Sequence, residues 1–317
     1  MITKALAMRD VFLEKIWQEM SVDSSIFFIT ADFGSPVLDK IRNDFPNRFV
    51  NVGVAEQNLI NITAGIAIEG FKVFAYAIAP FITMRCFEQI RVSLALLSEV
   101  RPMNVTLIGV GAGYSYVVSG PTHQCYEDIT IMRALPNFQV LSPSDHVSAG
   151  EMFANCLNNI GLKYLRFDAQ ILPVIYAKNP PLISTGFHVH NKGNNICIVA
   201  TGFMMKTALR IVNDKLSGMN NIGLIDFFDL SCYSKDKLLN EIKSYNLIVS
   251  LEEGFSGRGG LDAMLNEFIL KNDLNIKVFS IGVDPCYSFA LGTRDELHEE
   301  VGIGYQAVKN KISLLCK

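Results

Sequence analysis

Glu56 is the residue of this sequence whose type and position best suit chemistry. It directly precedes an apolar segment that runs from Leu59 to Ile68. A carboxylate beside so many apolar side chains costs free energy unless it has a partner or a task, and general acid–base catalysis is such a task. The plainer explanation is that Glu56 complements the dipole of a helix start, where glutamate is common.

His123 is the second candidate, in the motif Gly-Pro-Thr-His-Gln at residues 120–124. Glycine and proline predict a loop there, and Glu-Asp-Ile at 127–129 predicts that a helix starts soon after. An imidazole can exchange a proton near neutral pH or bond a hydroxyl group. A lone loop histidine is more often an ordinary surface residue, so the motif by itself indicates a site only weakly.

The elements that must position these two residues alternate between strands and helices. In the first half we expect strands at 26–30, 49–54, 72–78, 104–110, 138–141 and 164–166, and helices at 5–20, 55–69, 81–97, 128–134 and 145–158. Strands separated by helices indicate an α/β fold with a parallel sheet that is covered on both faces. Glu56 then lies at the junction between a strand and a helix.

The second half begins a new α/β pattern after a proline-containing stretch between 172 and 185. We expect strands at 196–201, 222–226, 247–251 and 277–281, with helices at 202–212 and after the glycine-rich turn at 257–260. We therefore predict a first domain at residues 1–178, a linker at 179–189 and a smaller C-terminal α/β domain at 190–317.

Composition narrows the functional classes. The chain has 317 residues, enough for two domains, and its net charge is 28 − 31 = −3, which argues against a non-specific nucleic-acid binder and a polybasic membrane surface. Seven scattered cysteines without a C-x-x-C motif, and a charged first helix in place of a secretory leader, favour reduced thiols in the cytoplasm. The apolar run 59–82 is interrupted at residues 69–72, which predicts a buried helix, a turn and a strand, not a membrane span.

Between Arg48 and Asp145 the sequence resembles the pyrimidine-binding half of transketolases and related thiamine-diphosphate enzymes. The resemblance rests on Gly-Val-Ala-Glu-Gln at 53–57, Phe81 and the loop 120–124, in this order; it continues more loosely through the second half. It implies that Glu56 bonds the cofactor's aminopyrimidine and helps the cofactor to lose a proton from its thiazolium ring. It also implies that Phe81 packs on the aminopyrimidine and that His123 reaches the substrate.

The same resemblance assigns weaker roles to three more residues. Asp32, after the strand 26–30, matches a family aspartate near the cofactor, although an Asx turn would also explain it. Met84 and Phe87 follow Phe81 at helical spacing, where the family lines the cofactor pocket. For these two residues simple core packing is at least as good an explanation.

The family builds its diphosphate and metal site on a separate domain with a Gly-Asp-Gly motif, which this sequence lacks. The resemblance therefore implies the C-terminal subunit of a split transketolase. An N-terminal partner subunit would hold the diphosphate and Mg²⁺ (or Ca²⁺), and the expected assembly is an α₂β₂ heterotetramer. No metal ligands are expected in this chain.

The expected substrate contacts depart from the usual family pattern. Arg9 matches a phosphate ligand of the family, whereas Ser119, Gly111 and Ala169 stand where the family has an acid, a histidine and an arginine. Each lost charge-assisted bond would remove about 1.5–3 kcal/mol. We therefore hypothesise that the chain transfers a two-carbon ketol unit from a modified or unphosphorylated ketose to an aldehyde.

Three alternatives remain from the sequence. A 1-deoxyxylulose-5-phosphate synthase shares the Glu56 and His123 patterns but is normally a longer chain. A 2-oxoacid dehydrogenase beta chain has a suitable length but a less similar histidine loop. A non-catalytic binding homologue could keep the fold, although Glu56, Phe81 and His123 together argue against it.

Overall fold

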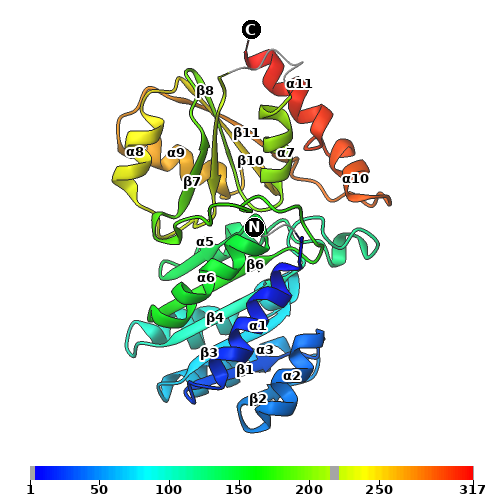
Figure 1. Ribbon diagram of the computed structural model, residues 1–317, viewed down its shortest axis with the longest axis vertical. Coiled ribbons are helices and arrows are strands. Elements are labelled where there is room, and N and C mark those ends of the chain that lie inside the picture. Colours follow the sequence, from blue (N-terminus) through cyan, green and yellow to red (C-terminus); the bar gives the residue numbers. More distant parts are fainter. Residues whose placement is uncertain (1–3, 215–220, 317) are drawn as a thin grey trace.

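The computed structural model describes residues 4–214 and 221–316, and its strands form two sheets that follow one another along the long axis of the molecule (Figure 1). The first sheet has six strands in the order β2-β1-β3-β4-β6-β5, and every neighbouring pair is parallel. Its strands are β1 (Ile26–Thr30), β2 (Phe49–Asn51), β3 (Lys72–Ile78), β4 (Asn104–Val110), β5 (Phe138–Leu141) and β6 (Gly161–Phe167). The predicted parallel α/β sheet is confirmed.

Helices cover both faces of this sheet because side chains alternate along its buried strands. The α-helices of this half are α1 (Met8–Met20), α2 (Pro36–Asp44), α3 (Glu56–Ile68), α4 (Phe87–Gln89), α5 (Asp128–Arg133) and α6 (His146–Asn158). In β3, Phe74 and Tyr76 join the core beneath α1 and α6, while Val73, Ala75 and Ala77 join the core beneath α3. Short 3₁₀ turns lie at Pro46–Arg48, Gly120–Thr122 and Ile183–Thr185.

The helix expected at 81–97 is not a regular α-helix. It consists of a π-helical turn at Phe81–Arg85, α4, and a second π-helical segment at Ile90–Leu96. Cys86, between the first two, has φ −119° and ψ 25°, outside the helical region. Within the first turn, the Thr83 hydroxyl donates to the carbonyl of Ala79 at 2.7 Å. π-helical turns widen the local spacing of side chains and are frequent at functional sites.

The second sheet is mixed, with five strands in the order β11-β10-β8-β9-β7. Its strands are β7 (Phe187–Asn191), β8 (Ile196–Ala200), β9 (Gly223–Phe227), β10 (Leu247–Phe255) and β11 (Lys277–Val283). Its helices are α7 (Met204–Val212), α8 (Lys235–Ile242), α9 (Leu261–Lys271), α10 (Arg294–Glu300) and α11 (Tyr305–Leu315). The antiparallel edge strand β7 was not predicted, because two histidines and an asparagine weaken its apolar pattern. Its first residues fall in the segment that was expected to be the linker.

Buried ion pairs join the two halves of the chain. Arg294 of α10 pairs with Asp168, just after β6, and with Glu253 of β10, each at 2.6 Å. His298 lies 2.5 Å from the other oxygen of Glu253. Burial alone would raise the pKa of Glu253, but Arg294 and His298 hold it well below its usual range. The carboxylate therefore stays charged inside the interface and needs its partners there.

Asp226 of β9 is a buried acid whose pKa is raised, in contrast to that of Glu253. Its oxygens accept hydrogen bonds from the hydroxyls of Ser144 and Tyr176, both at 2.7 Å, and it has no cationic partner among the described residues. Burial raises the pKa of Asp226 to about 7 from its ordinary value of 3.8. Over that pH interval the folded protein holds a proton that the unfolded chain has released.

We expect Asp226→Asn to become more stable relative to the unmodified protein as the pH rises from about 4 to about 7. In this interval the free energy of unfolding of the unmodified protein falls as the pH rises, because the unfolded chain has released the Asp226 proton that the folded protein still holds. Asparagine does not titrate, so the variant does not lose this stability. The difference should reach a few kcal/mol, since one pKa unit corresponds to about 1.4 kcal/mol. Urea unfolding at both ends of the interval measures it, with the exposed Asp284→Asn as the control. A stability difference that does not change with pH would contradict the expectation.

The structure bears on the expectations about membrane spans and about cysteines. Among residues 4–214 and 221–316, no helix is both long and apolar enough to cross a membrane. The apolar run 59–82 is divided between α3, a turn and β3, as predicted. All seven cysteines lie within the described residues, and each is a free thiol.

Candidate functional site

The candidate site lies at the edge of the first sheet where its parallel strands end. Asp32 follows β1, Glu56 follows β2 after a short turn, Phe81 follows β3 and Gly111 follows β4. Because these strands are parallel, their carboxyl ends meet at one edge, which is where ligands of open α/β sheets usually bind. Segments that are far apart in the sequence are therefore brought together there.

Glu56 is held at this edge by the turn that follows β2. Gly53 has φ +73°, a left-handed conformation that glycine adopts without strain. The side-chain oxygen of Asn51 accepts hydrogen bonds from the backbone amides of Gly53 and Asp32, and its amide donates to the Asp32 carboxylate at 3.0 Å. Asp32 thus supports the turn; its predicted role near a cofactor stays a prediction.

The Glu56 carboxylate is buried, with 3% of its side chain exposed, and forms one ion pair. Arg85 Nη1 lies 2.6 Å from Glu56 Oε2. The other oxygen, Oε1, has no hydrogen-bond partner among the described residues. Glu56 therefore keeps one acceptor oxygen for a further ligand. Its only ion-pair partner among the described residues is Arg85, whose side chain is 43% exposed.

Arg85 also contacts Phe81, which joins Glu56 to the histidine loop. The Arg85 guanidinium carbon lies 4.2 Å from the centroid of the Phe81 ring, a cation–π geometry. The Phe81 ring in turn meets the ring of His123 edge to face, with centroids 5.2 Å apart. The structure thus brings the three principal sequence candidates together, and the residue that connects them was not predicted.

His123 follows the short 3₁₀ turn at 120–122. Its Nδ1 lies 3.0 Å from the hydroxyl of Thr122, and its ring is 6.3 Å from the ring of Tyr116. The side chain is half-buried, so it can reach solvent or a substrate. Ser119 is exposed and precedes this turn, where its carbonyl accepts a hydrogen bond from Thr122.

Tyr116 occupies the space beside Gly111. Gly111 has φ +105°, and a Cβ there would overlap the Tyr116 ring, so no larger residue fits at this position while the ring stays in place. Burial raises the pKa of Tyr116 to about 12, against the opposing effect of Arg9. Tyr116 is therefore a neutral phenol near His123, able to donate a hydrogen bond.

Arg9 lies on α1, within electrostatic reach of Tyr116. Its Nε bonds the neighbouring Asp10 carboxylate at 2.8 Å, and Asp10 also accepts from the Ser35 hydroxyl at 3.0 Å. The charge of Arg9 is thus partly balanced within the protein. A phosphate at this position would have to compete with Asp10.

Met84 and Phe87 lie on the irregular helical segment beyond Phe81. Met84 is exposed, whereas Phe87 is half-buried and packs against the core beneath α3. For Phe87 this is the packing role that the sequence left open. The role of Met84 beside a cofactor stays a prediction.

Arg85 and Tyr116 are the residues that sequence reasoning missed. Arg85 follows Phe81 by four positions, a spacing that places two helical residues on one face and could have indicated the contact. Tyr116 gave no comparable signal, because it lies in a glycine-containing loop without periodicity. In residues 4–214 and 221–316, no group of three or more His, Cys, Asp or Glu side chains is arranged to hold a metal ion.

Comparison with known proteins decides the family. The family profile described as "Transketolase, pyrimidine binding domain" matches residues 4–173, more than half of the chain. The chain belongs to the transketolase family. A second profile, "Transketolase, C-terminal domain", matches residues 186–308, so the transketolase likeness extends over both sheets.

Several similar transketolases are divided into separate subunits. One subunit of the apulose-4-phosphate transketolase of Actinobacillus succinogenes is 29% identical over 269 residues, which cover 84% of each chain. The 6-deoxy-6-sulfo-D-fructose transketolase subunit SqwH of a Clostridium species is 26% identical, with 93% of this chain and 90% of that subunit covered. A solved split gene transketolase, described as an inactive beta4 tetramer, superimposes with a TM-score of 0.83 at 25% identity and 97% coverage of both chains.

Longer transketolases share the fold over about half of their length. The transketolase of Campylobacter jejuni superimposes with a TM-score of 0.82 at 18% identity, covering 99% of this chain and 47% of that one. The chain is therefore homologous to one of the subunits of split transketolases, and its fold corresponds to one half of the longer enzymes.

Proposed function

We propose that this chain is the pyrimidine-binding subunit of a two-chain transketolase that uses thiamine diphosphate to transfer a two-carbon ketol unit. The observation that carries the proposal is the Glu56 carboxylate, buried after the end of β2 with one oxygen unpaired among the described residues, in a cluster with Arg85, Phe81 and His123. This oxygen is not among the fully buried atoms that lack a partner, so a hydrogen-bond donor that enters from solvent can reach it.

The residues present fit the pyrimidine part of the cofactor. Glu56 Oε1 is a free acceptor within the described part of the chain, and Phe81 is an aromatic ring near it on which a flat heterocycle can pack. When bound, thiamine diphosphate supplies the carbanion chemistry that breaks and forms the C–C bond. The task of this chain is to accept or return a proton at Glu56 and to hold substrate groups at His123.

Arg85 has to move before a flat ring can pack on the face of Phe81 that it covers. It now occupies one oxygen of the carboxylate and one face of Phe81. Because its side chain is 43% exposed, it can move into solvent at little cost. We infer that Arg85 covers Phe81 and stays paired with Glu56 Oε2 until a ligand takes its place on the ring.

A partner subunit is expected to supply the other half of the site. Residues 4–214 and 221–316 contain no cluster of three or more His, Cys, Asp or Glu side chains that could hold a metal ion, and no Gly-Asp-Gly motif occurs in the sequence. Exposed apolar side chains lie on the segments that carry the cluster, at Val54, Met84, Val92 and Leu96. Such a surface suits a protein interface. The partner would hold the diphosphate and its Mg²⁺ or Ca²⁺, in an α₂β₂ assembly.

The expected substrate follows from the surroundings of Gly111 and Arg9. Gly111 leaves room for the neutral Tyr116, and the charge of Arg9 is partly balanced by Asp10. These features favour a ketose that carries no phosphate at this end, or a modified one. The similar subunits described above act on a phosphorylated and a sulfonated sugar according to their names, so relatives alone do not decide the substrate.

Reconstitution tests the proposal. The chain is co-expressed with the Gly-Asp-Gly subunit of the same genome, and the complex should bind thiamine diphosphate and transfer a ketol unit, whereas the chain alone should not. Turnover is compared between xylulose 5-phosphate and unphosphorylated or modified ketoses. A complex that binds cofactor but transfers no unit from any ketose would overturn the transferase assignment. Strong preference for xylulose 5-phosphate would overturn only the substrate expectation.

A 1-deoxyxylulose-5-phosphate synthase activity is the second candidate. The synthase of Pseudoalteromonas translucida is 26% identical over 317 residues, covering 97% of this chain but 48% of that enzyme. The same reconstituted complex distinguishes the two, because a synthase would consume pyruvate and release carbon dioxide. If no partner chain associates and no cofactor is bound, a non-catalytic homologue is favoured instead.

A further inference from the structure

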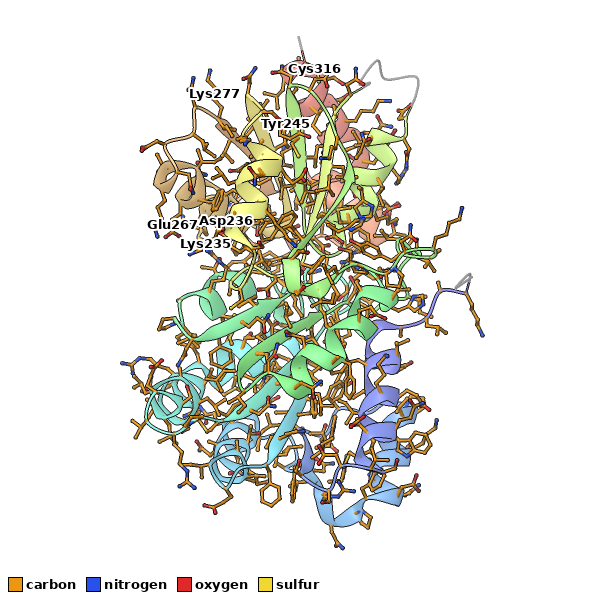
Figure 2. The ribbon with its side chains drawn as sticks, turned by 60° about the vertical axis from the view of Figure 1, so that its left-hand side comes forward. Lys235, Asp236, Tyr245, Glu267, Lys277 and Cys316 are labelled. Atoms are coloured by element: carbon orange, nitrogen blue, oxygen red, sulfur yellow. The ribbon has the colours of Figure 1, made fainter. Side chains whose placement is uncertain are left out.

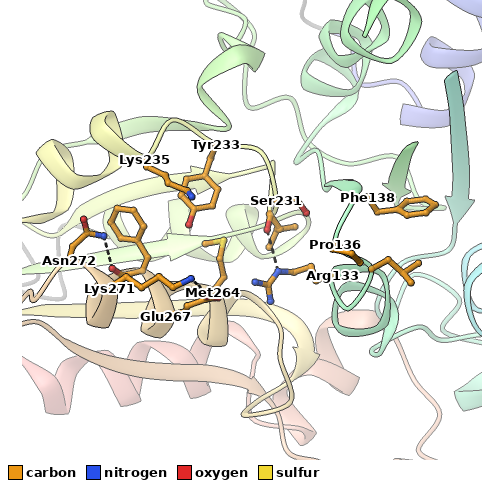
Figure 3. Close-up of a pocket in the computed structure, with 13 residues that line it drawn as sticks. Arg133, Pro136, Phe138, Ser231, Tyr233, Lys235, Met264, Glu267, Lys271 and Asn272 are labelled. Carbon is orange, nitrogen blue, oxygen red and sulfur yellow. Dashed lines mark hydrogen bonds and ion pairs between the residues drawn. The ribbon is translucent and has the colours of Figure 1, made fainter. Parts of the chain in front are cut away.

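A concave site lies where the two domains meet, away from the Glu56 cluster. It is a cavity of about 420 Å³, and its walls come from the end of α5 and the turn before β5, from the segment 230–235 that leads into α8, and from α9 (Figure 3). This volume falls in the lower range of small-molecule sites. Glu56, Phe81 and His123 are not among its lining residues.

The cavity carries an excess of positive charge. Arg133, Lys235 and Lys271 line it, and Glu267 is the only acidic residue that does. The chain as a whole has a net charge of −3, so a local excess of two positive charges is not a consequence of composition. An anion that entered the cavity would meet cations from both domains.

Arg133 bonds no carboxylate within the described residues. Its Nε donates to the carbonyl of Leu230 at 3.2 Å, and its Nη1 donates to the carbonyls of Gly259 and Gly260 at 2.5 and 3.0 Å. The guanidinium is half-buried, and this burial lowers the pKa of Arg133. Its charge is thus fixed in place by neutral acceptors, and an anion beside it would lower the cost of burying it.

Lys235 is the first residue of α8, where the helix dipole disfavours a cation. It has no ion-pair or hydrogen-bond partner in the described part of the chain. Figure 2 shows Lys235 and Glu267 on the same side of the molecule, near the boundary between the domains. An anionic ligand would offset both the dipole and the unpaired charge.

Glu267 is shared by all three cations. It pairs with Lys271 at 2.5 Å. This hydrogen bond, with smaller effects from Arg133 and Lys235, lowers the pKa of Glu267. Among the described lining residues one carboxylate therefore faces three cations, a formal excess of two positive charges, while Glu252 and Asp262 outside the lining also act on Arg133.

The rest of the cavity can hold a compact apolar or sugar portion. Tyr233 and Phe268 pack against each other with ring centroids 6.0 Å apart, and Met264 and Phe138 also line the wall. The Tyr233 hydroxyl and the side chain of Asn272 add polar groups. A site with a cationic end and an aromatic wall suits a small molecule that has one strongly charged group.

We propose that this interdomain cavity binds a small phosphate monoester, whose dianionic group lies among Arg133, Lys235 and Lys271. A phosphate monoester carries about −1.5 to −2 charges near neutral pH, which matches the excess of two. The proposal is independent of the transketolase reaction, because it concerns residues outside the Glu56 cluster.

Calorimetric titration of the full chain with phenyl phosphate tests the proposal, since this probe is not a sugar and cannot act as a ketose or aldehyde substrate. We expect Lys235→Gln and Lys271→Gln each to weaken binding roughly tenfold, because each removes a charge-assisted contact. Lys243→Gln, just past the opposite end of α8, should leave the affinity unchanged and is the matched control. Glu267→Gln should tighten binding, a direction that simple loss of structure would not produce.

Two results would overturn the proposal. One is a lack of phenyl phosphate binding by the unmodified chain at millimolar concentration. The other is that the Lys235→Gln, Lys271→Gln and Glu267→Gln variants bind phenyl phosphate with the same affinity as the Lys243→Gln control. Inorganic phosphate, titrated in parallel, should bind more weakly than phenyl phosphate, because it cannot contact the aromatic wall. Equal affinity would show that the aromatic wall does not contribute to binding.

Discussion

Glu56→Gln should lower ketol transfer by the reconstituted complex by roughly 10²- to 10⁴-fold, the usual contribution of a positioned general acid or base. Glutamine keeps the size of the side chain and can still accept a hydrogen bond, but it cannot take up or release a proton. The ion pair with Arg85 is lost as well. Because 43% of the Arg85 side chain is exposed, its charge stays solvated and this loss should change the stability of the chain little.

The matched control is Glu69→Gln, which removes an exposed carboxylate at the other end of α3. It should leave both ketol transfer and the thermal midpoint of the complex unchanged. Initial rates with saturating thiamine diphosphate separate the chemical role of Glu56 from its contribution to cofactor affinity. A Glu56→Gln complex that retained more than about a tenth of the activity would show that Glu56 is not the essential acid–base group.

Arg294→Met should destabilise the protein by about 3–5 kcal/mol, the range for removing one partner of a buried ion pair. Methionine is shorter and unbranched, fills part of the space of the arginine, and leaves Asp168 and Glu253 buried without their main cation. The guanidinium also lies 3.6 Å from the centroid of the Phe203 ring, so a favourable cation–π contact is lost. Urea unfolding of the unmodified chain and the variant measures the difference.

The exposed Arg258→Met is the control for this substitution, and it should change stability by no more than about 0.5 kcal/mol. Adding Glu253→Gln to Arg294→Met should restore part of the lost stability, because one of the two carboxylates left without Arg294 is then neutral. If Arg294→Met unfolded at the same urea concentration as the control, the buried ion pairs would not be what holds the two halves together.

Local patterns determined most of the secondary structure. The strands at 26–30, 72–78, 104–110 and 138–141 were predicted with the bounds that the structure has, since each is a short apolar run between turn residues. The helices α1 and α3 were predicted to within a few residues. The strand β7 and the helices α2, α8, α10 and α11 were not predicted. Polar residues dominate most of them, although α2 and α8 each have an apolar side, and their stability depends on packing.

The irregular segment after β3 could not be predicted either. Sequence favoured one helix at 81–97, whereas Phe81–Arg85 forms a π-helical turn. The choice between an α-helical and a π-helical turn depends on whether backbone amides bond the carbonyl four or five positions earlier. That choice leaves the apolar residues of the sequence unchanged, so it gives no periodic signal.

The sequence by itself determined that a parallel sheet would bring an acid, an aromatic ring and a histidine loop to one edge, because strand ends of a parallel sheet share that edge. Tertiary structure alone decided what these residues touch. Arg85 reaches Glu56 across 29 positions of the chain, and Arg133 meets the carbonyls of the C-terminal domain across 97, 126 and 127 positions. Contacts over such separations depend on how whole elements pack, and sequence periodicity reports only on neighbours within one element.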